Sequence, residues 1–229
     1  MKKLCLILPA YNEALIIKSV LKNIKKYLHK LNGIKTTIVV VDDGSSDDTN
    51  SIAGSENVII LKHVINRGLG AALATGLSFA KKNYYDLALT MDSDGQHHVN
   101  DIKKMLQPIL DNQADVVTGT RMKRIIGMPI DRIIINFFSN IMTFFLFDIW
   151  TSDSQSGFRA FNQRAIRVIK LKTQGMEVSS EFFGEIKKNK LRLIEVPIKV
   201  IYTPYSRQKG QNNLNSLSIG WKLLLRLFR

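Results

Sequence analysis

The sequence predicts an α/β fold of the Rossmann-like kind, with a mainly parallel sheet flanked by helices. Short apolar runs alternate five times with helical patterns over the first 120 residues. The connections between these runs are too short for anything but right-handed crossovers, which build a parallel sheet covered on both faces. Acidic and other polar residues follow several of the runs directly, at the strand ends where such sheets bind ligands.

Composition limits the classes of protein that the chain can belong to. With 229 residues, 45% of them hydrophobic, it can form one large domain with a full core. Its formal charge of +14 indicates an anionic partner: nucleic acid, a phosphorylated ligand or an acidic membrane. Cys5 lies in an apolar run and is expected to be buried. The apolar run after Met1 is too short for a signal sequence, so we expect a cytoplasmic protein.

The first half of the chain is expected to supply five strands and the helices between them. The predicted strands are the apolar runs at residues 4–8, 37–41, 58–61, 86–91 and 115–120. Helical patterns follow at residues 14–30, 71–82 and 100–111, with a shorter helix ending near Ala53.

Two carboxylates one residue apart, Asp92 and Asp94, follow the fourth predicted strand. Residues two apart in an extended segment point the same way, so both side chains can reach one point in space. Hard cations such as Mg²⁺ or Mn²⁺ require such oxygen ligands. An ordinary turn at the end of a strand is the alternative interpretation, because Asp, Ser and Gly are common turn residues.

Other polar side chains are expected at the same edge of the sheet, because the carboxyl ends of parallel strands meet there. The residues that converge are Tyr11, Glu13, Asp42, Asp43, Asp92, Asp94 and Arg121.

The second half of the chain has a different pattern. Residues 133–150 are expected to form a helix that is either buried or lies on lipid, and its charge-free part of 15 residues is too short to cross a bilayer. A polar loop at 153–159 follows, then a helix at 178–188 and an edge strand at 192–201 that contains Pro197.

The chain is expected to end in an amphipathic helical extension. From Leu214 onward apolar residues share one face, and basic residues share another. This pattern suits an anionic membrane surface, and a terminal helix docked on the core is the alternative. We therefore divide the chain into a domain of residues 1–205 and a basic amphipathic segment of residues 206–229.

Four motifs stand out in the chain: Pro-Ala-Tyr-Asn-Glu at 9–13, Val-Asp-Asp-Gly-Ser at 41–45, Asp-Ser-Asp-Gly-Gln-His at 92–97 and Asp-Ser-Gln-Ser-Gly-Phe-Arg at 153–159. They resemble the motifs of family 2 glycosyltransferases with the GT-A fold, within the polyprenyl-phosphate sugar synthases of the dolichyl-phosphate mannose synthase type. The resemblance implies a half that binds nucleotide sugar and metal, residues 1–121, and an acceptor half, residues 122–205.

The resemblance also implies roles for individual residues. Mg²⁺ or Mn²⁺ would be held by Asp92, Asp94 and Gln96, and the catalytic residues would be Asp94, Asp153, Arg121 and Arg207. The acceptor would contact Arg132, Gln155, Ser156 and Arg159. The nucleotide sugar would contact Pro9, Tyr11, Asn12, Glu13, Val41, Asp42, Asp43, Asp92, Ser93, Asp94, Gln96, Arg121, Arg207 and Lys209.

The activity that the resemblance implies is inverting transfer of a sugar from a GDP-mannose or UDP-glucose type of donor to a dolichyl or undecaprenyl phosphate. The enzyme would act while peripherally attached to the inner face of the membrane. A hydroxyl acceptor is the main alternative, and it would need a general base, for which Asp153 is best placed. A nucleotidyltransferase would share the sheet and the carboxylates. Binding of nucleic acid is suggested by charge alone, so we expect no such partner. Asn213 stands where the family has a lysine, and Lys209 could replace that charge.

Overall fold

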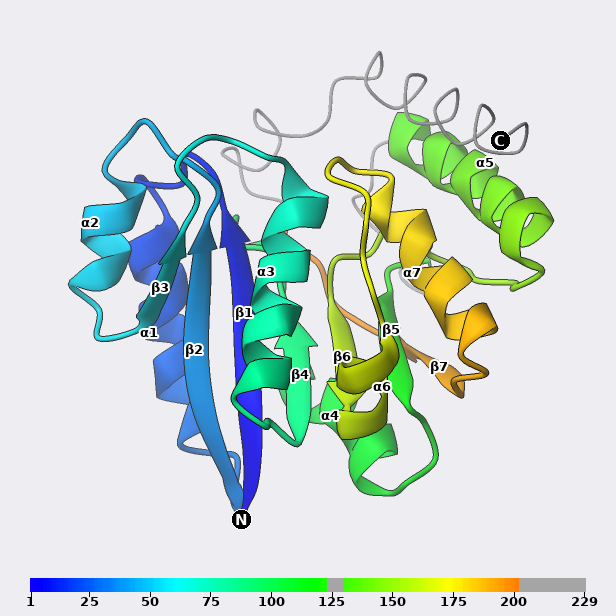
Figure 1. Ribbon diagram of the computed structural model, residues 1–229, viewed down its shortest axis with the longest axis horizontal. Coiled ribbons are helices and arrows are strands. Elements are labelled where there is room, and N and C mark those ends of the chain that lie inside the picture. The colour runs from blue at the N-terminus through cyan, green and yellow to red at the C-terminus, as the bar shows by residue number, and fades with distance from the viewer. Residues whose placement is uncertain (123–129, 202–229) are drawn as a thin grey trace.

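The computed structural model describes residues 1–122 and 130–201, and it contains one seven-stranded sheet with the strand order β3-β2-β1-β4-β6-β5-β7 (Figure 1). β6 is antiparallel to its neighbours β4 and β5, and every other pair of strands is parallel. The predicted mainly parallel α/β fold is therefore confirmed. The strands are β1 (Lys2–Ala10), β2 (Ile34–Asp42), β3 (Ile59–Lys62), β4 (Leu87–Thr90), β5 (Val116–Thr120), β6 (Arg159–Asn162) and β7 (Leu193–Pro197).

Helices cover both faces of the sheet. One face carries α1 (Ile17–Leu28), α2 (Thr49–Gly54) and α4 (Asp101–Leu110), and the other carries α3 (Leu69–Lys82), α6 (Gln163–Val168) and α7 (Val178–Lys188). The long helix α5 (Ile130–Phe147) packs against α7 and lies beside the sheet, at the right of Figure 1.

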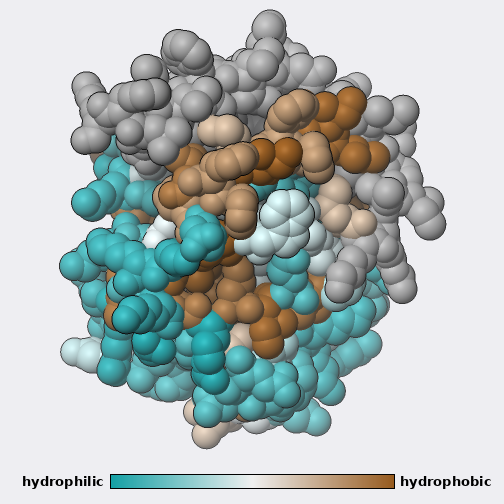
Figure 2. Space-filling model, turned by 90° about the vertical axis from the view of Figure 1, so that its right-hand side faces the viewer, coloured by the Kyte–Doolittle hydropathy of each residue, from teal (hydrophilic) through white to brown (hydrophobic). Residues whose placement is uncertain are grey.

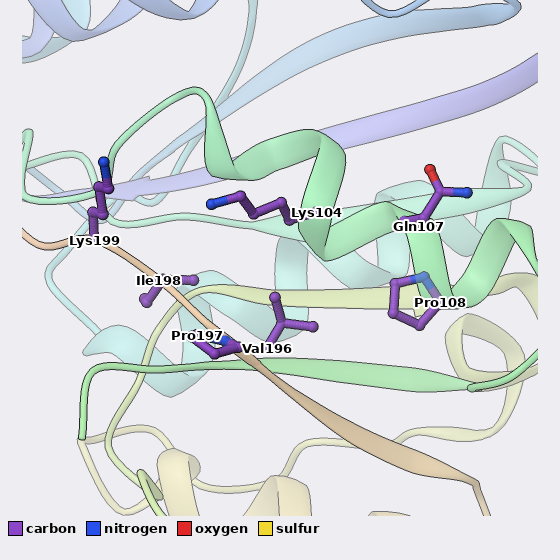
Figure 3. Close-up of a pocket in the computed structure, with 7 residues that line it drawn as sticks. All are labelled: Lys104, Gln107, Pro108, Val196, Pro197, Ile198 and Lys199. Atoms are coloured by element: carbon purple, nitrogen blue, oxygen red, sulfur yellow. The ribbon is translucent and has the colours of Figure 1, made fainter. Parts of the chain in front are cut away.

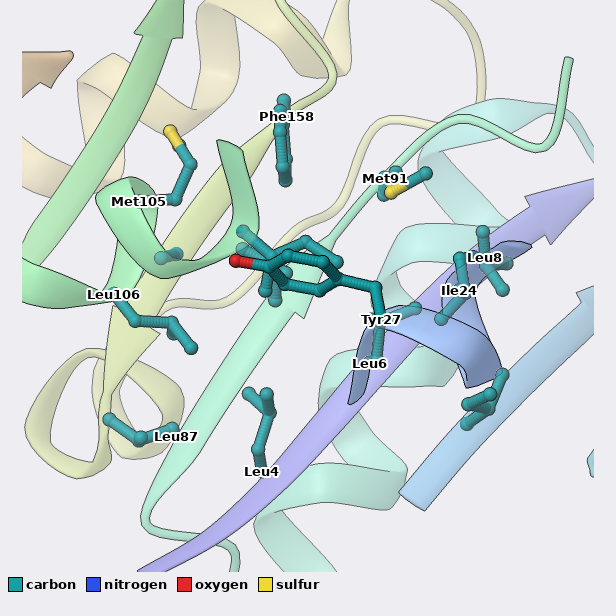
Figure 4. Packing of buried hydrophobic residues seen from close by; sticks show 14 of the residues in the cluster. Leu4, Leu6, Leu8, Ile24, Tyr27, Leu87, Met91, Met105, Leu106 and Phe158 are labelled. Carbon is teal, nitrogen blue, oxygen red and sulfur yellow. The ribbon is translucent and has the colours of Figure 1, made fainter. Parts of the chain in front are cut away.

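β1 lies at the centre of the fold because both of its faces are apolar. Leu4, Leu6 and Leu8 point into one core cluster, while Cys5 and Ile7 point into the other. The first cluster also receives Tyr27 from α1 and Met91 from the end of β4 (Figure 4). Cys5 is fully buried, as predicted, and burial raises the pKa of its thiol to about 12.

The strand β6 was missed by the sequence prediction, which placed a polar loop at residues 153–159. Arg159 begins this strand, and a charged residue before only two apolar ones gives no strand signal. The structure buries Arg159 nonetheless, with 1% of its surface exposed. Tertiary contacts therefore decide the structure of this segment.

The predicted helix at 133–150 corresponds to α5, which begins earlier and ends at Phe147 because Asp148 adopts a positive φ of 52°. Within residues 1–122 and 130–201, no helix is both long enough and apolar enough to cross a membrane. The predicted C-terminal helix lies outside the described residues.

The topology gathers the polar turns at one edge of the sheet. β1, β2, β3, β4 and β5 run in the same direction, so the segments that follow them all emerge at the edge that lies uppermost in Figure 1. β6 runs in the opposite direction, so the turn that precedes it starts from this edge as well.

Candidate active site

Asp92 emerges from β4 and lies against the turn that precedes β6. Its Oδ2 is 2.9 Å from Nε2 of His97, and this histidine packs against the ring of Phe158. Burial alone would raise the pKa of Asp92. The hydrogen bond from His97, together with the charges of His97, Arg121 and Arg159, outweighs burial and holds that pKa below its ordinary value.

Asp94 has the opposite electrostatic character. Burial and the nearby charge of Asp92 raise the pKa of Asp94 to about 6. Gln96 donates to both oxygens of Asp94, from its backbone nitrogen to Oδ1 at 2.9 Å and from Nε2 to Oδ2 at 2.7 Å. The side chain of Gln96 therefore orients Asp94 in this structure. The negative charge of Asp92 makes ionisation of Asp94 unfavourable, and a bound cation would relieve the repulsion between the two carboxylates.

A cavity of about 250 Å³ opens beside these carboxylates. Seven residues that the sequence assigned to the nucleotide sugar line it, namely Pro9, Tyr11, Glu13, Asp43, Asp92, Ser93 and Asp94. The sequence prediction did not include the other lining residues, which are Ala10, Asn66, Gly68, Leu69, Ala72 and Met176. Most of these lie at the start of α3, where the two glycines at 68 and 70 were the available signal. Met176 comes from the distant loop before α7, and nothing in the sequence indicated it.

Asp43 fixes the loop that leads into α3. Its carboxylate accepts hydrogen bonds from the backbone nitrogens of Arg67 at 3.0 Å and Gly68 at 2.6 Å, and it lies 2.6 Å from Nδ1 of His63. The other ring nitrogen of His63 is 2.9 Å from the hydroxyl of Thr75 on α3. One wall of the cavity is thus held to the end of β2.

Several other predicted nucleotide contacts maintain the shape of the turns. Asp42 is fully buried and accepts hydrogen bonds from Ser45 and Asn50. Asn12 joins the turn after β1 to the turn after β2, because its Oδ1 accepts a hydrogen bond from the backbone nitrogen of Ser46. Val41 is fully buried in the core cluster on the α3 side of the sheet, and it does not line the cavity.

Ser93 has a similar bridging role, although it also lines the cavity. Its buried hydroxyl donates a 2.7 Å hydrogen bond to the carbonyl of Pro9. This contact ties the turn after β4 to the end of β1.

The half-buried Arg121 and the fully buried Asp153 form an ion pair at the end of β5. Arg121 donates to Oδ2 of Asp153 from its backbone nitrogen at 2.9 Å and from Nε at 2.6 Å, and its Nη2 donates to Oδ1 at 2.6 Å. Asn136 of α5 supplies a fourth donor, to Oδ1, at 3.0 Å. Asp153 is completely buried. Its carboxylate therefore fixes the guanidinium of Arg121 and has its oxygens engaged by donors.

The turn between Asp153 and β6 contains both satisfied and unsatisfied polar groups. Arg159 donates to the carbonyls of Ser154 and Ser179, its guanidinium lies 4.5 Å from the ring centre of Phe182, and burial lowers its pKa to about 10. Gln155 Nε2 and Ser156 Oγ are buried atoms with no hydrogen-bond partner in the described part of the chain. Arg159 supports the turn from inside the core.

Some predicted residues cannot be placed. Arg132 belongs to α5, and the position of its side chain is outside the part of the chain that the structure describes. Arg207 and Lys209 lie outside the described residues.

The described residues fit a divalent cation held jointly by protein and ligand. No cluster of three or more His, Cys, Asp or Glu side chains able to hold a metal occurs in the described ranges. Mg²⁺ commonly needs only one or two protein carboxylates when substrate phosphates complete its coordination. Asp92 and Asp94 provide such a pair beside the cavity.

A separate cavity of about 400 Å³ lies between α4 and β7 (Figure 3). Lys104, Gln107 and Pro108 of α4 face the segment from Val196 to Lys199 across it. Among the described residues that line it there is no carboxylate and none of the predicted site residues, so we do not assign the reaction to it.

α5 presents a large apolar surface near the site. Among its residues 133–147, five apolar side chains are exposed, with fractions from 39% to 74%: Ile134, Phe137, Phe138, Phe144 and Phe145. Figure 2 shows the hydrophobic band on this side of the molecule. The opposite stripe of α5 is buried and polar, and it includes Asn136 and Asn140, which bond to the turn at 152–154. The sequence allowed either a buried helix or a helix that lies on lipid. In the structure one face of α5 is buried against the turn at 152–154, and the other face is exposed and apolar.

The fold and the paired carboxylates define the class of protein, a glycosyltransferase with the GT-A fold. The chain belongs to glycosyl transferase family 2, whose family model matches residues 5–170. This confirms the family that the four motifs indicated.

Two relatives and one solved structure illustrate the relationship. The UDP-N-acetylglucosamine–dolichyl-phosphate N-acetylglucosaminyltransferase of Methanococcus voltae is 38% identical, and the match covers 98% of this chain and 96% of the relative. The undecaprenyl-phosphate mannosyltransferase of Micrococcus luteus is 25% identical, with coverage of 93% and 88%. The structure of glucosyl-3-phosphoglycerate synthase from Mycobacterium tuberculosis with Mn²⁺, UDP-glucose and glycerol 3-phosphate has a TM-score of 0.64 at 16% identity, with coverage of 97% and 80%.

Proposed function

We propose that this glycosyltransferase is an inverting, metal-dependent enzyme that transfers a sugar from a nucleotide sugar to a polyprenyl phosphate. The observation that carries the choice of acceptor is the state of Asp153. A hydroxyl acceptor needs a base that removes its proton. Asp153, the carboxylate best placed for that task in the sequence, is completely buried and accepts four hydrogen bonds from Arg121 and Asn136. A lipid phosphate is already an anionic nucleophile and needs no such base.

The relatives support the same acceptor class. The Methanococcus protein is named for a dolichyl phosphate and the Micrococcus protein for an undecaprenyl phosphate, while their sugars differ. We infer that the lipid phosphate is the shared substrate and that donor specificity varies. The relative that is 38% identical uses a UDP-linked sugar by name, so we propose a UDP-sugar as the donor of this enzyme, with N-acetylglucosamine as the first sugar to test.

The roles of the residues follow from their positions. The cavity beside Asp43 and Tyr11 would receive the nucleoside, and Asp92 and Asp94 would hold Mg²⁺ or Mn²⁺ against the diphosphate. The metal, when bound, would neutralise the charge that the diphosphate gains as the sugar bond breaks. Arg121 is fixed in advance by Asp153 and lies near enough to lower the pKa of Asp92. It would bind oxygens of the donor diphosphate without having to reorganise.

The acceptor phosphate would enter from the side opposite the nucleoside cavity. Gln155 Nε2 and Ser156 Oγ, both buried and without a partner among the described residues, are donors that suit phosphate oxygens. Direct attack by the phosphate oxygen on the anomeric carbon would invert its configuration. The leaving nucleoside diphosphate would take the bonding electrons.

We place the enzyme on the inner face of the membrane. The exposed phenylalanines of α5 can enter the interface of a bilayer, and the net charge of +14 favours anionic lipids. An enzyme that binds there would meet both a cytoplasmic nucleotide sugar and the phosphate head of a membrane lipid.

Transfer of a labelled sugar tests the proposal. The protein should convert labelled UDP-N-acetylglucosamine and polyprenyl phosphate into a product extractable with organic solvent, and EDTA should abolish its formation. Parallel reactions with GDP-mannose and UDP-glucose define the donor. Transfer to a hydroxyl acceptor with none to the lipid phosphate would contradict the proposal. Release of inorganic diphosphate in place of a nucleoside diphosphate would indicate a nucleotidyltransferase.

A further inference from the structure

Glu195 is an acidic residue on β7 that the mechanism above does not use. β7 lies at the edge of the sheet beside β5, and Glu195 is paired in register with Thr118. Its carboxylate accepts three hydrogen bonds, all from one turn: from Thr151 Oγ1 to Oε1 at 2.5 Å, from the Ser152 backbone nitrogen to Oε1 at 2.8 Å, and from Ser152 Oγ to Oε2 at 2.7 Å.

This turn leads directly into Asp153. Ser152 Oγ also lies 2.7 Å from Oγ1 of Thr120, the residue before Arg121. A hydroxyl carries one proton, so when Ser152 donates to Glu195 it accepts from Thr120. A chain of hydrogen bonds thus runs from Thr120 through Ser152 to Glu195, one residue away from the contact between Arg121 and Asp153.

The arrangement joins two consecutive residues of one segment to two consecutive residues of another. Thr120 and Arg121 at the end of β5 contact Ser152 and Asp153, respectively. Asn140 of α5 holds the same turn through a 2.7 Å hydrogen bond to the carbonyl of Ser152. Glu195 provides the acceptor for three donors of this turn, and without it those donors would lose their partner.

We propose that Glu195 is a positioning residue that sets the orientation of Arg121 through the turn at 151–153. The inference rests on the proposed function, because it assumes that Arg121 binds phosphate oxygens in the reaction. Glu195 itself contacts neither the carboxylates of the metal site nor the nucleoside cavity. Its effect on the reaction would therefore pass through Arg121.

A double-mutant cycle with Arg121 separates positioning from general support of the fold. Glu195→Gln keeps the shape of the side chain but replaces one acceptor oxygen by a donor. We expect kcat/KM for transfer to fall about 10-fold or more, since small displacements of a catalytic group are costly. In the Arg121→Ala background the same change should cost less than about twofold, because the group that it positions is absent.

Glu185→Gln is the matched control. Glu185 is a buried acid on α7 whose carboxylate accepts hydrogen bonds from the backbone nitrogen of Lys170 and the side chain of Asn189, and neither residue belongs to the turn at 151–153. Its substitution should lower the melting temperature at least as much as Glu195→Gln does, with kcat/KM unchanged. Ser152→Ala is a second variant, which removes the bridging hydroxyl and keeps the backbone contact, and it should show the same coupling to Arg121.

The outcomes are distinct. If the losses caused by Glu195→Gln and Arg121→Ala multiply, Glu195 acts independently of Arg121 and the inference is wrong. It is also wrong if Glu195→Gln lowers the melting temperature and leaves kcat/KM intact. If the unaltered enzyme transfers no sugar to polyprenyl phosphate, the proposed function fails instead, and the same cycle is then measured on the dissociation constant of UDP with Mn²⁺.

Discussion

Gly157 lies so close to Asp92 that a β-carbon at position 157 would be 2.3 Å from Oδ1 and 2.7 Å from Oδ2 of that carboxylate. The turn before β6 and the carboxylate of Asp92 are therefore in direct contact. Only glycine allows this approach, because any side chain at position 157 would displace the carboxylate.

Gly157→Ala should weaken the metal site. We expect the affinity for Mn²⁺ to fall roughly 10- to 100-fold, the range typical when the support of a metal ligand is disturbed. Isothermal titration of the enzyme with Mn²⁺ in the presence of UDP measures this. Gly54→Ala is the matched control, because a β-carbon there meets nothing within 4 Å. Equal affinities in the two variants would show that Asp92 does not contribute to metal binding.

Binding of Mn²⁺ should weaken as the pH falls through about 6. Burial and the charge of Asp92 raise the pKa of Asp94 to about 6, so below that pH a proton competes with the cation for this carboxylate. The apparent dissociation constant should rise about tenfold for each pH unit below 6. Titrations between pH 5 and 8 measure it. Asp111→Asn, an exposed substitution at the end of α4, should leave the profile unchanged, whereas Asp94→Asn should remove this pH dependence.

The same shift in pKa has a consequence for stability without metal. An unfolded aspartate titrates near 3.9, so between about pH 4 and 6 the folded chain binds more protons at Asp94 than the unfolded chain does. The contribution of Asp94 to stability is therefore lost as the pH rises through this window. At pH 7.5 and without metal, Asp94→Asn should melt at a higher temperature than the unaltered protein. A lower melting temperature would contradict the sign of this shift.

Asp153→Asn should reduce transfer to a lipid phosphate without abolishing it. The substitution removes the charge that fixes Arg121, and breaking a buried ion pair typically costs about 3–5 kcal/mol of folding free energy. Kinetics and thermal melting measure the two effects. Asp115→Asn is the control, because Asp115 is a buried acid paired with Arg192 outside the site. It should lose stability and keep kcat. Complete loss of transfer by folded Asp153→Asn protein would favour a general base and a hydroxyl acceptor.

Membrane binding should depend on the aromatic surface of α5. Replacing Phe137, Phe138 and Phe145 together by Ser should lower the partition coefficient on anionic vesicles by about 1,000-fold or more, because each phenylalanine buried in the interface is worth about 1.5–3 kcal/mol. Vesicle sedimentation measures it. Tyr84→Ser, at an exposed aromatic residue before β4, is the control. Activity on a short-chain, water-soluble acceptor should survive in the triple variant, and unchanged vesicle binding would exclude α5 as the contact.

The sequence predicted the half of the fold in which local pattern and tertiary structure agree. β1 and β4 are built on the apolar runs at residues 4–8 and 87–89, and the acidic residues after them could only emerge at the sheet edge. The contacts of Asp43 and Asp153 could not be predicted from the sequence, because their partners Gly68 and Arg121 are distant along the chain. The motif at 153–159 was recognised, yet its strand was not. Arg159 is exposed in most sequence contexts and is buried here only because the carbonyls of two serines receive it.

Because β6 runs antiparallel to its neighbours, the segment between β5 and β6 begins and ends at the same edge of the sheet. The chain leaves the sheet at Thr120 and returns at Arg159 on the same edge, beside the metal carboxylates. α5, the long element between these two points, pairs with no strand of the sheet, so its length and composition do not set the register of the strands. Exchanging α5 between relatives, with Arg121, Asp153 and Gly157 kept, should transplant acceptor preference while the donor half stays intact, which makes this helix a natural unit for building chimeric transferases.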